Sequence, residues 1–141
     1  MKYKLTENKK EINGVVLHRI ECVTAFGNVK QGEKGGWIEK EDNLSQEDGS
    51  WVYGNAWVSG DAVIKKEKDY LVFKNNWSSG RYFTWTKSNN MWRVGCFYGT
   101  GKELIDKAYK DSKLSGDCYK ETVEYVERLN ELTNNFKILI V

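Results

Sequence analysis

A six-residue repeat between Trp51 and Ile64 constrains the fold more than any other feature of this sequence. Trp51-Val52-Tyr53-Gly54-Asn55-Ala56 is followed by Trp57-Val58-Ser59-Gly60-Asp61-Ala62, and a weaker copy begins with Val63-Ile64. A period of six fits neither an amphipathic helix, with its period of about 3.6, nor the simple alternation of a strand. Short strands separated by regular turns are typical of a parallel β-helix, so the repeat predicts one.

The residue types within the repeat support this interpretation. Val52 and Val58 are β-branched and suit short extended segments. The pairs Gly54-Asn55 and Gly60-Asp61 suit turns with positive φ. The alternative is a β-hairpin that turns at Gly54-Asn55. A hairpin does not explain two matched copies of the same six residues, so we favour the coil.

The stretch resembles the left-handed β-helix of hexapeptide-repeat proteins, in which three six-residue units complete one coil. It holds two clear units and two or three weaker ones. A solenoid buries its core by stacking, and about three repeats are usually needed for stability. We therefore expect other segments to cover the open ends, and we expect self-association into a dimer or trimer.

A more specific resemblance extends from about Leu5 to Tyr109. The residues that carry it are Phe26-Gly27-Asn28-Val29, Gly32, Gly35 to Glu39, Asp42 to Glu47, and the unit Trp51 to Ala56. In this order they resemble a family of phage and prophage hexapeptide-repeat proteins, which carry more copies of a Tyr-Gly-(Asn/Asp)-Ala unit. The later segment Val94 to Thr100 resembles the part that opens their C-terminal helical region. Here the repeat array is reduced, and Asp48-Gly49-Ser50 replaces a regular unit.

The remaining elements complete a mixed α+β fold: a truncated left-handed β-helix, an antiparallel hairpin and two C-terminal helices. We expect one domain over residues 1–141, with N-terminal strands and a cap in 1–35, the β-helix in 36–64, a hairpin region in 65–98, and helices with a final strand in 99–141. The expected strands are Lys2–Leu5, Val15–Val23, Tyr70–Phe73, Arg81–Thr86, Met91–Tyr98 and Phe136–Val141. Thr100 and Glu103 have capping-box spacing and predict a helix start. Ser115-Gly116 predicts a break between the two helices.

Composition excludes several classes of protein. A net charge of +2 argues against a chain that coats nucleic acid. The three cysteines are far apart and have no metal-ligand spacing, which indicates reduced thiols. The sequence shows no signal peptide and no apolar run of the roughly 18 residues that a membrane span needs. We expect a cytoplasmic protein in a bacterial host.

The sequence lacks a convincing set of catalytic residues. Its single histidine, His18, lies in a predicted strand, although hexapeptide-repeat acyltransferases use a histidine as general base. The carboxylates Glu39, Glu41 and Asp42 are more typical of a solvated loop than of a cation site. The glycine-rich segment from Gly32 to Ile38 lacks the ending of a phosphate-binding P-loop. We therefore predict a protein that is not an enzyme and needs neither cofactor nor metal.

Aromatic and basic residues form the best candidate interaction surface, because Trp, Tyr and Arg concentrate in binding hot spots. The candidates are Trp77, Arg81, Tyr82, Trp85, Trp92 and Arg93. The competing interpretation places most of them in the core of a hairpin layer. Trp51 and Trp57, six residues apart, offer an alternative exposed face.

The resemblance implies a non-catalytic, phage-derived protein that binds a protein or nucleoprotein partner in the bacterial host. An inhibitor of a bacterial defence system, such as an anti-CRISPR protein, is the specific expectation. Three alternatives stay open: a protein that sequesters a small nucleotide signal, a degenerate hexapeptide-repeat acyltransferase, and a structural phage component.

Overall fold

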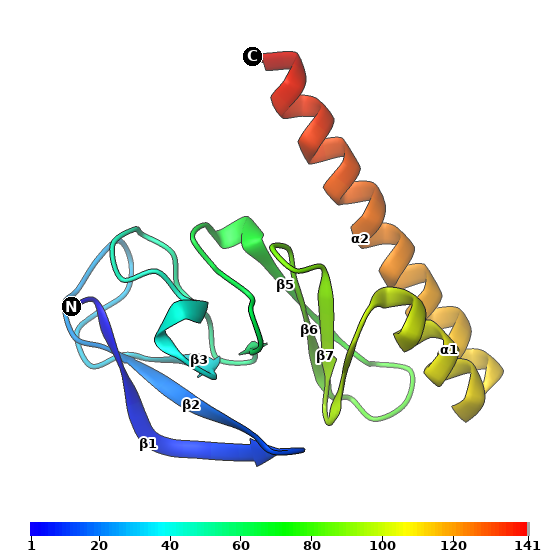
Figure 1. The fold of residues 1–141 in the computed structure, drawn as a ribbon, viewed down its shortest axis with the longest axis horizontal. Helices are drawn as coiled ribbons and strands as arrows, with labels where there is room; N and C mark the ends of the chain where they lie inside the picture. Colours follow the sequence, from blue (N-terminus) through cyan, green and yellow to red (C-terminus); the bar gives the residue numbers. More distant parts are fainter. Residues whose placement is uncertain (141) are drawn as a thin grey trace. The chain divides into compact units, whose positions relative to one another are not determined.

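The computed structural model describes the backbone of residues 1–140 and the side chains of residues 1–134. The chain forms two compact units, Met1–Gly99 and Thr100–Val141, and each is described by itself. Figure 1 shows the elements of both units.

The first sheet of the N-terminal unit has the order β1-β2-β3-β4, and its strands are β1 (Tyr3–Ile12), β2 (Val15–Cys22), β3 (Lys34–Ile38) and β4 (Trp57–Val58). β1 and β2 form an antiparallel hairpin that turns at Asn13-Gly14, where both residues have positive φ. Positive φ at both central residues is the geometry that matches the twist of hairpin strands. β1 therefore runs through the polar stretch Thr6–Glu11, beyond the predicted end at Leu5.

The second sheet is an antiparallel meander of β5 (Tyr70–Lys74), β6 (Tyr82–Thr86), β7 (Met91–Val94) and β8 (Phe97–Gly99). The predicted hairpin is confirmed as β6 and β7, in which Trp85 pairs with Trp92. The predicted second strand is split in two, because Gly95 has φ +55° and turns the chain into β8.

The predicted left-handed β-helix from Gly36 to Ile64 is wrong. The repeat forms only the two-residue strand β4, which pairs in parallel with β3, and one parallel bridge between Leu44 and Ile64. Short 3₁₀ helices at Glu41–Asn43 and Glu67–Asp69 flank this region. Two repeats supply too few stacked segments for a solenoid. The chain instead adds β4 to the edge of an otherwise antiparallel sheet.

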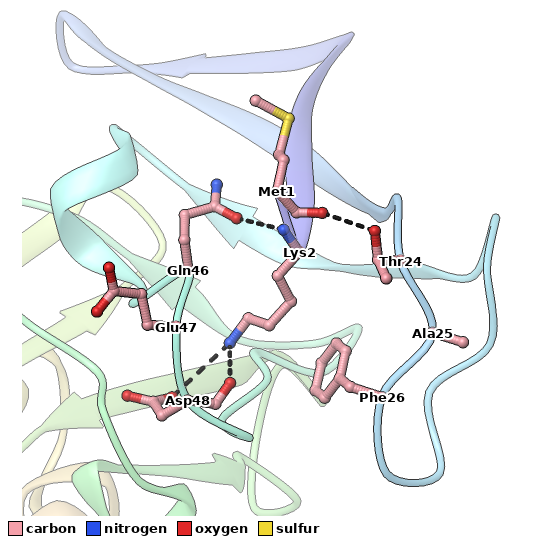
Figure 2. A pocket seen from close by; sticks show the side chains of 8 residues that line it. All are labelled: Met1, Lys2, Thr24, Ala25, Phe26, Gln46, Glu47 and Asp48. Atoms are coloured by element: carbon pink, nitrogen blue, oxygen red, sulfur yellow. Dashed lines mark hydrogen bonds and ion pairs between the residues drawn. The ribbon is translucent and has the colours of Figure 1, made fainter.

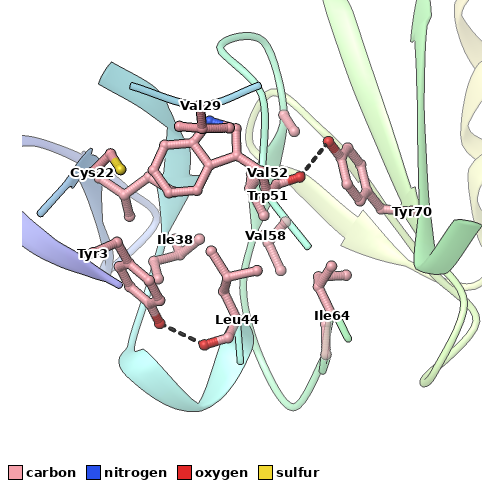
Figure 3. Packing of buried hydrophobic residues seen from close by; sticks show 13 residues of the cluster. Tyr3, Cys22, Val29, Ile38, Leu44, Trp51, Val52, Val58, Ile64 and Tyr70 are labelled. Atoms are coloured by element: carbon pink, nitrogen blue, oxygen red, sulfur yellow. Dashed lines mark hydrogen bonds between the residues drawn. The ribbon is translucent and has the colours of Figure 1, made fainter. Parts of the chain in front are cut away.

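The apolar positions of the repeat nevertheless form the core of this unit. Val52, Ala56, Val58, Ala62 and Ile64 are all buried, and they pack with Tyr3, Ile20, Cys22, Val29, Ile38, Leu44, Trp51 and Tyr70. Figure 3 shows Tyr3 donating its hydroxyl proton to the carbonyl of Leu44, at 2.6 Å. A chain with a period of six can thus bury the valine and the alanine of each clear unit without building a regular coil.

The Gly35-Gly36 pair allows β3 to approach the repeat closely. A Cβ atom on Gly36 would lie 2.3 Å from the carbonyl oxygen of Tyr53. The Gly36 amide instead donates to the carbonyl of Val52 at 2.7 Å. This approach places Trp37, the next residue, beside Trp57.

Polar contacts join the repeat to the second sheet. The Trp57 amide donates to the hydroxyl of Thr84 at 3.1 Å, and the Val63 amide donates to the hydroxyl of Ser88 at 2.8 Å. The Tyr70 hydroxyl donates to the carbonyl of Trp51 at 2.9 Å and accepts from the Tyr53 amide at 3.1 Å. These bonds fix the repeat loop against β5 and β6.

The C-terminal unit is the helix pair α1 (Gly101–Asp111) and α2 (Lys113–Ile140). The predicted capping box is confirmed: the Glu103 amide donates to the Thr100 hydroxyl at 3.2 Å, and Glu103 Oε1 accepts from the Thr100 amide at 3.0 Å. None of the helices in the described chain has the length and apolar character needed to cross a membrane.

Two predictions about this unit are wrong. The break lies at Ser112, and α2 continues through Ser115-Gly116. Gly116 serves close packing, because a Cβ there would lie 2.1 Å from the Tyr109 ring. The predicted final strand is also wrong, since Phe136–Ile140 belongs to α2. Its last residue, Val141, lies outside the described residues. A short apolar run does not distinguish a strand from a helix segment.

Candidate binding pocket

Two of the predicted interaction residues, Trp85 and Trp92, are core residues with exposed fractions of 3% and 1%. Their rings lie 6.5 Å apart across β6 and β7, and Trp92 stacks on Phe73 at 6.1 Å. Trp85 Nε1 donates to Asn90 Oδ1 at 2.8 Å, which satisfies its polar atom. These tryptophans hold the second sheet together.

Arg93 is also buried, with 5% of its surface exposed. Its Nη2 donates to the hydroxyl of Ser59 at 2.9 Å, and its guanidinium lies 4.7 Å from the ring centroid of Tyr98. Burial lowers the pKa of Arg93. Because Ser59 belongs to the repeat and Arg93 to β7, this contact fastens the repeat to the second sheet.

Trp77 is half-buried in the loop before β6, where its ring meets Phe83 edge-on at 6.2 Å. Trp51, from the alternative surface, is 1% exposed and lies in the core. The structure therefore separates the aromatic candidates into core residues and a smaller exposed group.

The exposed group surrounds a cavity of about 280 Å³ in the N-terminal unit. We call it the indole pocket, and its lining residues are Lys10, Trp37, Gly54, Asn55, Trp57, Arg81 and Tyr82. Tyr82 is the first residue of β6 and Arg81 immediately precedes it; both are exposed. Of the six predicted residues, these two are the ones that line the pocket.

The two indoles are neighbours because of the parallel pairing of β3 and β4. Trp37 pairs with Trp57, and residues paired in this way project from the same face of a sheet. Lys10, on β1, places its Nζ 4.5 Å from the ring of Trp37 and 5.0 Å from the ring of Trp57. Both distances are within the range of a cation–π interaction. Lys10 thus bridges the two rings.

The pocket is electropositive. Lys10 and Arg81 contribute two cations, and none of the lining residues carries a carboxylate. Within the described part of the chain, the ion pairs use other lysines: Lys2, Lys4, Lys34 and Lys113. The pocket is therefore complementary to a negatively charged ligand.

A second cavity, of about 250 Å³, lies at the N-terminus and is lined by Met1, Lys2, Thr24, Ala25, Phe26, Gln46, Glu47 and Asp48 (Figure 2). The Lys2 ammonium donates to the carbonyls of Asp48 at 2.9 Å and Ser50 at 2.6 Å, and it lies 4.9 Å from the Phe26 ring. Burial lowers the pKa of Lys2, and Asp48 acts against this shift. These contacts tie β1 to the loop before the repeat, which is a structural role.

The residues considered for catalysis are engaged in local contacts. His18 Nδ1 lies 3.1 Å from the carbonyl oxygen of Thr6, on the paired strand. Glu39 Oε1 accepts from the Gly60 amide at 2.7 Å, whereas Glu41 and Asp42 are exposed. Among the described residues, no three His, Cys, Asp or Glu side chains are grouped to hold a metal ion.

Sequence reasoning missed four residues of the indole pocket: Gly54 and Asn55, which were interpreted only as a turn, and Lys10 and Trp37. Lys10 lies beyond the expected strand Lys2–Leu5, and Trp37 lies in the glycine-rich segment Gly32 to Ile38. The signal for both was the hairpin turn Asn13-Gly14. This turn extends β1 to Ile12, so that Lys10 pairs with Leu17 of β2. Arg19, two residues further along β2, pairs with Trp37 of β3.

No protein-family model matches the chain. A stretch of 72 residues is 36% identical to the uncharacterised acetyltransferase YdcK of Escherichia coli K12, and the match covers 45% of this chain. It spans only 22% of the length of that relative. Part of this chain is thus similar in sequence to a bacterial acetyltransferase. This similarity lends no support to a phage origin or to a role against bacterial defence.

Proposed function

We propose that this protein is a non-catalytic binding protein that takes a small ligand in the indole pocket. The observation that carries the proposal is the convergence of Trp37, Trp57 and Tyr82 with the cations Lys10 and Arg81 in a pocket whose lining residues include no carboxylate. A concave site with aromatic walls and a few placed polar groups is the usual form of a small-molecule site.

The positions of Trp85, Trp92 and Arg93 favour this proposal over a flat protein interface. Side chains that are at least 95% buried cannot serve as interface hot spots without unfolding of the sheet. The remaining exposed group is small and concave, and so it suits a small molecule better than a protein surface. Binding of a host protein or nucleoprotein is accordingly the less favoured form of the proposal.

A competition experiment with a small-molecule extract of bacterial cells tests the proposed function. The wild-type protein and Trp57→Leu are each incubated with the extract, and retained compounds are identified by mass spectrometry. We expect one or more compounds to be retained by the wild type and lost from the variant. Circular dichroism checks that Trp57→Leu is folded. Equal retention by both proteins, or none by either, contradicts the proposal.

A second candidate is acyl transfer, which the similarity to an acetyltransferase favours. In this chain the base would be His18, which is half-buried and engaged with the carbonyl of Thr6. Acetyl transfer from acetyl-coenzyme A to amine and hydroxyl acceptors tests this reading. Turnover by the wild type that disappears in a folded His18→Ala variant would favour the enzyme over the binding protein.

A further inference from the structure

We propose that the ligand of the indole pocket is a nucleoside monophosphate, with its base on the aromatic residues and its phosphate between Lys10 and Arg81. The inference rests on the proposed function and names the chemical class of the ligand.

The aromatic surface suits a nucleobase. Trp57 is half-buried and Tyr82 is 43% exposed, and both line the pocket. Lys10 Nζ lies 5.0 Å from the Trp57 ring and Lys74 Nζ lies 5.5 Å from the Tyr82 ring, so a base would stack on the ring surface that these ammonium groups leave uncovered. Every nucleobase has a planar π face, and stacking on aromatic side chains is a common way of binding an unpaired base. Trp37 is 7% exposed and supports Trp57 from the neighbouring strand.

The charge of the pocket suits a phosphate. Arg81 presents a planar set of donors that matches phosphate oxygens, and Lys10 adds a second positive charge. Gly54 and Asn55 also line the pocket, and the backbone hydrogen bonds found within the described chain include none donated by their amides. A phosphate group would supply an acceptor for these donors.

The same charge disfavours a cationic ligand. Two neighbouring indoles would otherwise suit an ammonium ion. Lys10 already occupies that position, at 4.5 and 5.0 Å from the two rings. An incoming cation would have to displace Lys10 and would then meet Arg81 without a compensating carboxylate.

The volume limits the size of the ligand. Ligand sites are usually about 300–1,000 Å³ in volume. At about 280 Å³ the indole pocket lies just below this range. It therefore fits one nucleotide better than a dinucleotide.

The test measures binding of adenosine monophosphate, adenosine and inorganic phosphate by calorimetry, with tryptophan fluorescence as a second readout. We expect adenosine monophosphate to bind at least tenfold more tightly than adenosine or phosphate, and to quench the fluorescence. Lys10→Ala and Arg81→Ala should each weaken its binding about tenfold or more and leave adenosine binding nearly unchanged. Tyr82→Ala should weaken the binding of both adenosine monophosphate and adenosine.

Lys9→Ala is the matched control, because neighbouring residues of a strand project to opposite faces and both lysines are exposed. It removes the same charge and should leave binding unchanged. An equal loss in Lys9→Ala and Lys10→Ala overturns the proposed phosphate site, as does equal affinity for adenosine and adenosine monophosphate. Retention of a compound other than a nucleotide, dependent on Trp57, would refute the ligand class and leave the proposed function standing.

Discussion

At the scale of single residues, the two arginines of the predicted surface have different roles. Arg93 is buried against Ser59 and Tyr98, whereas Arg81 is exposed at the pocket. Arg93→Ala should lower the free energy of unfolding by about 2 kcal/mol or more, because it leaves a cavity and removes a charged hydrogen bond. Arg81→Ala should change it by no more than about 0.5 kcal/mol. Urea denaturation of the two variants measures these changes. Equal losses of unfolding free energy in Arg93→Ala and Arg81→Ala would contradict the assigned roles.

Tyr70 makes the stability of the N-terminal unit sensitive to alkaline pH. Burial raises its pKa to about 12, whereas a tyrosine in the unfolded chain has a pKa of about 10. The neutral phenol is thus favoured in the folded state. Its contribution is complete below pH ~10 and is lost as the pH rises through 12. Burial raises the pKa values of Tyr3 and Tyr98 as well, so they act in the same direction.

Tyr70→Phe tests this contribution. At neutral pH the variant should be less stable by about 1–3 kcal/mol, because it leaves the carbonyl of Trp51 and the amide of Tyr53 without their partner. The difference from the wild type should shrink as the pH rises from 10 to 12. Chemical denaturation at a series of pH values measures it. A difference that stays constant over this range would argue against the assignment.

At the scale of secondary structure elements, Gly116 fixes the packing of α2 against α1. A Cβ at this position would lie 2.1 Å from the Tyr109 ring, whose hydroxyl donates to Asp117 Oδ1 at 2.6 Å. Alanine favours a helix by about 1 kcal/mol over glycine, but overpacking costs about 1–3 kcal/mol. We therefore expect Gly116→Ala to lower the melting temperature of the helical signal in circular dichroism.

The double variant Tyr109→Ala/Gly116→Ala separates these effects. Once the ring is absent, the alanine should act through helix propensity alone. The double variant should then be more stable than Tyr109→Ala. If Gly116→Ala destabilises the protein equally with and without the ring, close packing is not the reason for the glycine.

Local sequence patterns predicted the elements that are determined by a few neighbouring residues. The capping box at Thr100 and Glu103 needs only one turn of helix, and the hairpin of β6 and β7 needs only its own turn. The exposure of tryptophans could not be predicted in this way. Trp92 is buried because Phe73, on a non-adjacent strand, stacks on it. Trp57 stays partly exposed because β4 lies at the end of its sheet.

At the scale of the whole molecule, the apolar residues that recur every six positions are buried, but the repeat did not predict how their backbones pair. Val52, Val58 and Ile64 are buried, as a period of six requires. The long hairpin of β1 and β2 supplies the partners for β3, and so the repeat adds only β4 to a sheet. Pairing between distant segments depends on register, which a local pattern does not specify.

Self-association remains a prediction from the sequence. It was expected because a truncated coil would expose apolar ends, and the observed fold has no such coil. Multi-angle light scattering over a range of concentrations measures the oligomeric state. A dimer or trimer would confirm the expectation, and a monomer at every concentration would contradict it.

The most direct test of the indole pocket is an amide and indole N–H spectrum of isotope-labelled protein during a titration with adenosine monophosphate. We expect the resonances of Gly54, Asn55 and the indoles of Trp37 and Trp57 to shift together and to saturate. The indoles of Trp85 and Trp92, buried in the other sheet, should stay in place. Absence of shifts in the pocket, or shifts centred on the cavity at Lys2 and Phe26, would contradict it.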